Sequence, residues 1–243
     1  MFWFCRTKPL NVYFYTTREL AFNHAKPKRA IEFTPAWFKN LPTQSIPENI
    51  DGVLQLRKNL RSCPGFTSLY SSGFMFQMWS DLHLEAGPDN FKYQFTDEIS
   101  RILPHRTDQF GNCPIIESHF HIKLENPWWI TADKNIDLLF SAPIWNSFGH
   151  DDFVVAPGAY SAHVGVLQAN INLFVKRQQE KKSWSILLGQ PLVHVVPITE
   201  RQIKLHYELV TEKELLSIMA KSPLYLMDSN KYRRAMKMCP HAK

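Results

Sequence analysis

The chain has 243 residues, of which 44% are hydrophobic and 21% are charged, enough to bury one large core with short appendages. No apolar run approaches the roughly 18 residues of a membrane helix, and the apolar start, residues 1–5, is shorter than the roughly 7–15-residue core of a signal peptide, so we expect neither a membrane span nor secretion. The net charge of +6 allows an acidic or phosphate-bearing partner, and four separated cysteines without a C-x-x-C pair exclude a zinc ribbon and a thioredoxin-type motif.

Sixteen prolines against nine glycines, and short segments that alternate apolar with polar residues, favour strands over helices. The first predicted strand covers residues 10–15. Residues 25–47 are rich in Pro, Lys and Asn and have no regular period, so they predict a long ordered arm pinned by Trp37 and Phe38. A short helix is predicted at residues 64–72, after the break Cys63-Pro64-Gly65.

The clearest strand of the first half is predicted at residues 74–85, and it forms a hairpin with residues 91–95 across the turn Gly87-Pro88-Asp89-Asn90. A helix is predicted at residues 212–221, because Thr211 and Glu214 form a capping box before an apolar run. The other predicted strands are residues 115–124, 137–141, 153–155, 162–175, 185–188, 192–197 and 202–210.

These elements predict an all-β, mainly antiparallel fold: a β-sandwich or jelly-roll-like domain with a short C-terminal helix and an irregular N-terminal arm. We expect residues 1–62 to form the N-terminal strand and a Pro-rich arm packed on the main domain. Residues 63–210 should form the β core, and residues 211–243 the helix and a basic tail.

One stretch has the spacing of a metal site. His119, His121 and Glu125 follow the His-x-His-x3-Glu pattern of cupin-type barrels, which hold Fe, Mn or Zn, and His163 lies where a fourth ligand would be sought. Alternation along a strand also puts both histidines on one face. Glu125, however, would lie roughly 13 Å along an extended strand from His121. We favour a strand with one wet face, and hence no cofactor.

Basic side chains gather in two later clusters, and these could meet a nucleotide, a nucleic acid or an acidic protein. Their members are Lys176, Arg177, Lys181, Lys182, Arg233, Arg234 and Lys237. The sequence has no glycine-rich phosphate loop and no Gly-x-Ser-x-Gly elbow. Since no catalytic motif is present, we lean towards a protein that is not an enzyme.

Several segments resemble a protein family of T4-like bacteriophages, cyanophages in particular. They are "AWFKNLP", "CPGFTSLYSSGFMFQMWSDLHLE", "NPWWITADKNIDLLFSAPIWN", "DDFVVAPGAYSAH" and "SILLGQPLVHVVPITER". Together they cover about half the chain; the sequence departs from the family around residues 162–172 and before Ser185. The resemblance implies a phage context and a β-sandwich, and it brings no activity with it.

We therefore expect a non-enzymatic phage protein, virion-associated or accessory, that acts through protein–protein contacts or self-association. It would lie in the host cytoplasm during infection or be incorporated into the virion. Trp37 and Phe38 are the predicted interface, since rigid aromatic side chains suit buried anchors; the alternative is that they pack on their own domain. The rival functions are a cupin-like metal-dependent enzyme and a nucleotide- or nucleic-acid-binding accessory protein.

Overall fold

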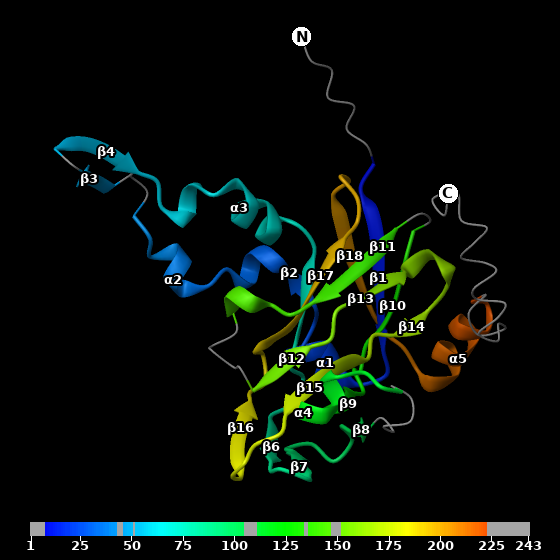
Figure 1. The fold of residues 1–243 in the computed structure, drawn as a ribbon. Helices are drawn as coiled ribbons and strands as arrows, with labels where there is room; N and C mark the ends of the chain where they lie inside the picture. Colours follow the sequence, from blue (N-terminus) through cyan, green and yellow to red (C-terminus); the bar gives the residue numbers. More distant parts are fainter. Residues whose placement is uncertain are drawn as a thin grey trace.

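The computed structural model describes residues 8–42, 46–50, 52–104, 111–133, 136–146 and 152–222. It is mostly β-strand, arranged in several antiparallel sheets with few short helices, so the predicted all-β, sandwich-like fold is confirmed. Figure 1 shows a β body from which an arm reaches to one side. Within these ranges no helix combines the length and the apolar character that crossing a bilayer requires.

The first sheet has the N-terminal strand inside it. Its order is β14 (Leu167–Gln168), β10 (Trp129–Ala132), β1 (Leu10–Thr16) and β18 (Ile203–Leu209). β1 pairs antiparallel with β10 and parallel with β18, and its alternate residues Leu10, Val12 and Phe14 are buried. β1 is therefore an inner strand of this sheet.

The second sheet crosses the middle of the body. Its order is β13 (Gly158–Ser161), β11 (Asp137–Ser141), β17 (Pro191–Pro197), β5 (Phe74–Gln77) and β2 (Lys28–Arg29). All four residues of β5 are buried, so the single strand predicted at residues 74–85 is divided: residues 74–77 are covered on both faces, and residues 82–86 form a separate strand with alternating burial. β5 ends at Gln77. The next residue, Met78, donates its N–H to Gln190 O, and its carbonyl oxygen accepts from the N–H of Gly189.

Two further sheets complete the body. One has the order β12 (Phe153–Val155), β15 (Ile171–Lys176), β9 (His119–Leu124) and β8 (Ile102–Pro104). The other is β16 (Lys182–Ile186), β6 (Leu82–Ala86) and β7 (Phe91–Phe95). The predicted hairpin is confirmed as the β6–β7 pair.

Two segments that were each predicted as one strand are not strand over their whole length. Residues 115–118 form α4 (Ile115–Ser118) rather than strand, because Pro114, with φ −61°, lies in a helical turn in which Ile116 N donates to Cys113 O and Glu117 N donates to Pro114 O. The predicted strand 162–175 is interrupted: it comprises the helical turn η5 (Ala162–Val164), β14 and β15. The break lies at Ala169, whose N–H bonds to Trp128 O.

The remaining helices are short. They are α1 (Glu19–His24), η1 (Ala30–Phe33), α2 (Ala36–Lys39), η2 (Leu60–Ser62), α3 (Pro64–Ser71), η4 (Ile144–Asn146) and α5 (Glu212–Ala220). The predicted helices α3 and α5 are confirmed. The capping box of α5 is formed as expected, with Glu214 N donating to Thr211 Oγ1 at 3.2 Å and Thr211 N donating to Glu214 Oε2 at 2.8 Å.

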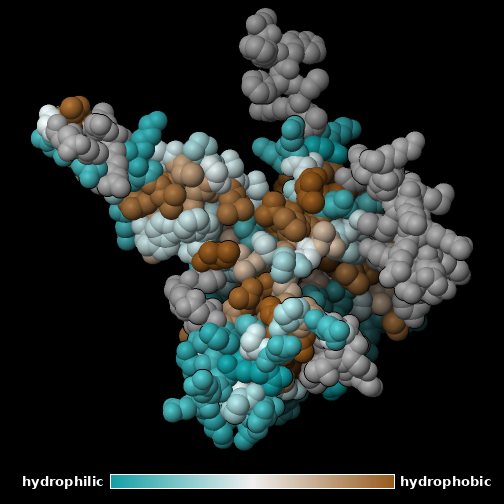
Figure 2. All heavy atoms as spheres, viewed as in Figure 1, coloured by the Kyte–Doolittle hydropathy of each residue, from teal (hydrophilic) through white to brown (hydrophobic). Residues whose placement is uncertain are grey.

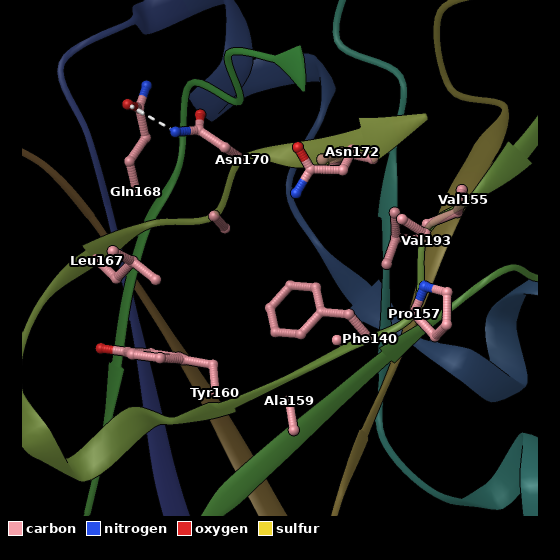
Figure 3. Close-up of a pocket in the computed structure, with 14 residues that line it drawn as sticks. Phe140, Val155, Pro157, Ala159, Tyr160, Leu167, Gln168, Asn170, Asn172 and Val193 are labelled. Carbon is pink, nitrogen blue, oxygen red and sulfur yellow. Dashed lines mark hydrogen bonds between the residues drawn. The ribbon is translucent and has the colours of Figure 1, made fainter. Parts of the chain in front are cut away.

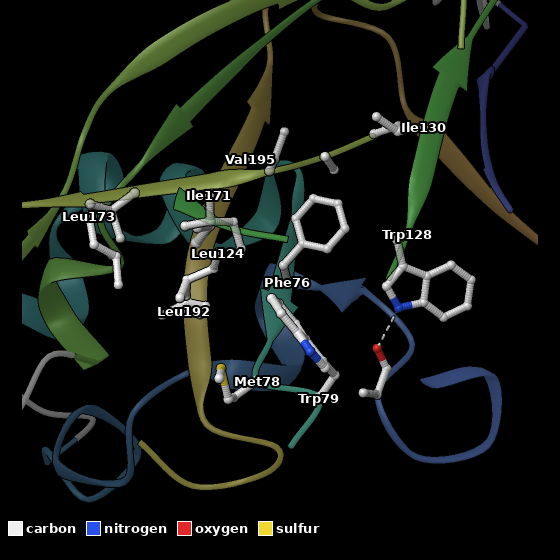
Figure 4. Close-up of a cluster of buried hydrophobic side chains, with 14 of the residues drawn as sticks. Phe76, Met78, Trp79, Leu124, Trp128, Ile130, Ile171, Leu173, Leu192 and Val195 are labelled. Atoms are coloured by element: carbon white, nitrogen blue, oxygen red, sulfur yellow. Dashed lines mark hydrogen bonds between the residues drawn. The ribbon is translucent and has the colours of Figure 1, made fainter. Parts of the chain in front are cut away.

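The core joins the sheets of the body and is rich in aromatic side chains; Figure 4 shows part of it. Phe14 of β1 meets Phe74 and Phe76 of β5 edge-to-face, at centroid distances of 5.1 and 5.9 Å. Trp128 is 1% exposed, and its indole N–H donates to Ala25 O at 3.0 Å, so its one polar atom is satisfied in the core.

Candidate protein-interaction surface

An aromatic cluster forms the root of the arm. Phe38 of α2 stacks on Phe66 of α3, with ring centroids 4.0 Å apart, and Phe66 stacks on Tyr70 at 4.8 Å. Trp37 meets Phe66 edge-on at 5.7 Å, and Trp145 of η4 does so at 5.3 Å. The predicted anchors of the arm therefore pack within their own chain, where they join α2 and α3 to η4.

The same cluster leaves apolar surface open. Trp37 and Trp145 are each 43% exposed, and Ile144 is 70% exposed. In Figure 2, hydrophobic surface gathers over α3 and on the adjoining edge of the body. Beneath it the Tyr70 hydroxyl donates to Asn146 Oδ1, and burial raises the pKa of Tyr70 to about 12, so this donor keeps its proton at neutral pH.

The far end of the arm is a hairpin that the sequence analysis missed. β3 (Ile46–Ile50) and β4 (Val53–Arg57) pair with each other as a two-stranded sheet. Gly52 has φ +80°, which the turn requires. The sequence signal was present, since Asp-Gly between two strand-like runs is a strong hairpin marker. At the turn, Val53 is 58% and Leu54 72% exposed.

A groove of about 440 Å³ opens where the arm meets the body. Its lining comes from α3, the end of β11, η4, β12 and β17, and includes Leu69, Tyr70, Ala142, Ile144, Val154 and His194. None of its lining residues is Lys, Arg, Asp or Glu. His194 is 2% exposed; its Nε2–H donates to Ser72 O at 3.2 Å, and burial lowers its pKa, which keeps the ring neutral.

The histidine stretch lies on β9 as two half-buried rings. Ser118 Oγ is 2.8 Å from His119 Nδ1, and the His121 ring lies 4.8 Å from that of Phe174. Burial, then the charge of Lys176, lower the pKa of His119. Both rings share the more open face of the strand, whose other face buries Ile122 and Leu124, as the alternation predicted.

The other two residues of the predicted metal set lie in different elements. Glu125 follows β9, where its N–H bonds to Arg101 O, and His163 belongs to η5, with Nδ1 3.5 Å from Ile136 O. In the described part of the chain, no group of three or more His, Cys, Asp or Glu side chains is placed to hold a metal ion. The sequence spacing is thus not matched by a converging set of ligands there.

The basic patch after β15 is largely engaged with its own chain. Lys182 lies 2.5 Å from Asp152 Oδ2, and Lys181 lies 3.5 Å from Glu85. Arg177 donates to Pro88 O at 3.0 Å and covers the ring of Phe120. Lys176 is exposed at the end of β15. Arg233, Arg234 and Lys237 lie outside the described residues.

Comparison with known proteins adds no relative from which a role could be transferred. No family model matches the chain, and neither does any curated protein or any solved structure.

Proposed function

We propose that the chain is a non-enzymatic assembly protein that binds a second copy of itself. The tip of the β3–β4 hairpin, Val53 and Leu54, occupies the groove at the root of the arm on the other copy. The observation that carries this proposal is the hairpin itself: it is a separate two-stranded sheet with two exposed aliphatic side chains at its turn.

A lone hairpin is at best marginally stable in water, because two strands bury too little apolar surface to offset the entropy of ordering them. Contact between the hairpin tip and a partner buries further apolar surface. Full burial of a Val or Leu side chain stabilises by about 1.5–3 kcal/mol. Docking of Val53 and Leu54 therefore orders the arm and holds two molecules together in one step.

The groove suits such an occupant. Its volume of about 440 Å³ accommodates two aliphatic side chains, and no charged residue lines it. Two polar side chains of its wall are already bonded within the chain: Tyr70 to Asn146, and His194 to Ser72 O. An apolar tip covers them without leaving a donor or acceptor unpaired, which would cost about 1–3 kcal/mol for each group.

A second copy is the occupant that the arrangement favours. The hairpin points away from the body that bears the groove (Figure 1), so a tip and the groove of its own chain lie at opposite ends of the arm. Reciprocal exchange of arms buries both tips in one two-fold symmetric interface, the commonest symmetry of homo-oligomers.

The phage context is part of the proposal, and only the resemblance of the quoted segments supports it. A small β protein that self-associates through an arm fits a virion-associated or accessory assembly role. Such a role uses neither the histidines of β9 nor the basic patch.

Sedimentation velocity over a range of protein concentrations tests the proposal. The wild type should dimerise, and Val53→Ser with Leu54→Ser should sediment as a monomer at the same concentrations. The matched control is Leu209→Ser with Leu216→Ser, which removes two leucines that are 46% and 56% exposed at β18 and α5. A monomeric wild type, or a dimer that survives loss of the tip but not of the control leucines, would contradict the proposal.

A further inference from the structure

The groove at the root of the arm is not the only hollow of the body. A small cavity of about 160 Å³ surrounds the ring of Phe140, with Leu167 on one side and Val193 on the other (Figure 3). A larger hollow of about 570 Å³ lies beside α1, and we call it the α1 pocket. Binding sites for small molecules enclose about 300–1,000 Å³, so the α1 pocket has the size of a ligand site.

The α1 pocket forms where four segments meet: the start of α1, the connection from β5 to β6, the segment after β7 and the turn before β17. Much of its wall is apolar. Trp79 is buried there, and its indole N–H already donates to Ser100 Oγ at 2.9 Å. Three further lining residues, Leu20, Ile99 and Leu188, are exposed. Exposed apolar side chains gathered around a hollow mark a surface that a ligand or partner covers.

The charge of the α1 pocket is opposite to that of the chain. Its described lining holds three carboxylates, those of Glu19, Asp81 and Asp97, and one cation, Arg18. The chain as a whole carries a net charge of +6. Arg18 Nη2 donates to Ile99 O at 3.3 Å, which engages part of the guanidinium. A local excess of carboxylates attracts cations and repels anions, so the pocket favours a positively charged ligand.

Two of these carboxylates are held by hydrogen bonds. Asp97 accepts from Ser100 N at 2.5 Å and from Ser100 Oγ at 2.6 Å. Burial raises the pKa of Asp97, but the hydrogen bonds from Ser100 and Ser80 hold it below 3.8, so this side chain is charged at neutral pH. Asp81 Oδ1 accepts from Leu188 N at 2.7 Å. Asp81 Oδ2 accepts no hydrogen bond within the described ranges and is not one of the buried unpaired polar atoms there, so it keeps contact with solvent.

The apolar wall and the excess of carboxylates together define the chemistry of the ligand. We propose that the α1 pocket binds a small amphipathic organic cation, with an apolar ring against Trp79 and Leu188 and an ammonium group facing Asp81 and Glu19. Burial of the ring supplies affinity, and the carboxylates select the cation among ligands of the same shape. The α1 pocket shares no described lining residue with the groove at the root of the arm, so this site is separate from the proposed dimer contact.

Three probes that share one ring system and differ in charge test the selectivity on the full-length chain. At neutral pH tryptamine is a cation, tryptophol is neutral and indole-3-propionate is an anion. In calorimetric titrations we expect tryptamine to bind roughly threefold or more tightly than tryptophol. Indole-3-propionate should bind more weakly than tryptophol. The preference for tryptamine should shrink as the salt concentration rises, because salt screens exposed charges.

Two matched pairs of variants locate the binding. Asp81→Asn removes the charge and keeps an oxygen for Leu188 N, so it should weaken tryptamine by roughly threefold and leave tryptophol unchanged. Its control is Asp133→Asn, since Asp133 also accepts a backbone N–H, that of Asn11 at 2.9 Å, and does not line the pocket. Leu188→Ala should weaken both tryptamine and tryptophol by roughly threefold. Leu187→Ala, at the neighbouring exposed leucine outside the lining, should weaken neither.

The inference would be overturned by any of three results: no tryptamine binding, equal affinity for tryptamine and tryptophol, or equal losses within either pair of variants. If Asp81→Asn does not fold, the three probes on the wild type and the pair of leucine variants still decide the question. Neither Val53 nor Leu54 lines the α1 pocket, so the result does not depend on whether the chain dimerises.

Discussion

The indole N–H of Trp37 donates to the backbone oxygen of Trp145 at 3.2 Å, across 108 positions of the chain. The two rings also lie 5.9 Å apart. This pair ties α2, at the root of the arm, to η4, at the rim of the groove. The direction in which the hairpin projects is thus set by contacts beside the surface that we propose it binds on another copy.

The first prediction concerns these arm aromatics. Trp37→Ser with Phe38→Ser should lower the free energy of unfolding by about 2–5 kcal/mol, because Phe38 is stacked on Phe66 within the same chain. Urea denaturation monitored by circular dichroism measures the change. Unchanged stability combined with lost self-association would instead assign the docking role to Trp37 and Phe38.

The second prediction tests the core. Phe76 is 1% exposed and packs edge-to-face on Phe14 and Phe74, so Phe76→Ala should destabilise the fold by about 3–5 kcal/mol. Leu209→Ala, at a side chain that is 46% exposed, is the control and should cost less than about 1 kcal/mol. Equal costs for the two changes would mean that the β1–β5 packing is wrongly assigned.

A third prediction follows from His194. Its folded-state pKa is lowered from 6.5 by burial, so above pH 6.5 the His194 ring is neutral in both the folded and the unfolded state. As the pH falls below 6.5, the unfolded chain takes up a proton that the folded state resists, and stability is lost until the folded pKa is reached. The pKa values of Asp97 and Asp152 are lowered from 3.8, so these carboxyl groups change the stability of the fold only at about pH 3.8 and below.

The melting temperature should therefore fall as the pH drops below about 6.5, and His194→Gln should flatten the slope. His119, whose pKa is also lowered by burial, acts in the same direction. Thermal denaturation at half-unit pH steps compares the two proteins. An identical slope in His194→Gln would show that His194 does not resist protonation in the fold.

The fourth prediction concerns the metal alternative. We expect purified protein to carry no stoichiometric iron, manganese or zinc by elemental analysis. His119→Ala with His121→Ala should cost about 0.5–1.5 kcal/mol, because the His121 ring lies 4.8 Å from that of Phe174; two fully exposed side chains would cost no more than about 0.5 kcal/mol. A bound metal that disappears in the double variant would restore the cupin-like hypothesis.

The sequence predicted those strands that keep one face in water. β1 and β9 show the expected alternation of burial along part or all of their length. β5 was misjudged because a strand covered on both sides has no polar face to mark it. The β3–β4 hairpin was missed because Pro47 and the prolines before it suggested an irregular arm, although Asp51-Gly52 indicated a turn.

The groove could not be predicted from the sequence, for a different reason. Leu69 of α3 and Val154 of β12 meet in one wall only after the sheets have formed.

A mixing experiment tests arm exchange most directly. The arm variant, Val53→Ser with Leu54→Ser, keeps an intact groove, whereas Ile144→Asp places a charge on the rim of the groove and keeps an intact arm. Each alone should be monomeric in sedimentation velocity. An equimolar mixture should form a heterodimer held by one arm–groove contact. A mixture that stays monomeric while the wild type dimerises, or single variants that dimerise like the wild type, would contradict arm exchange.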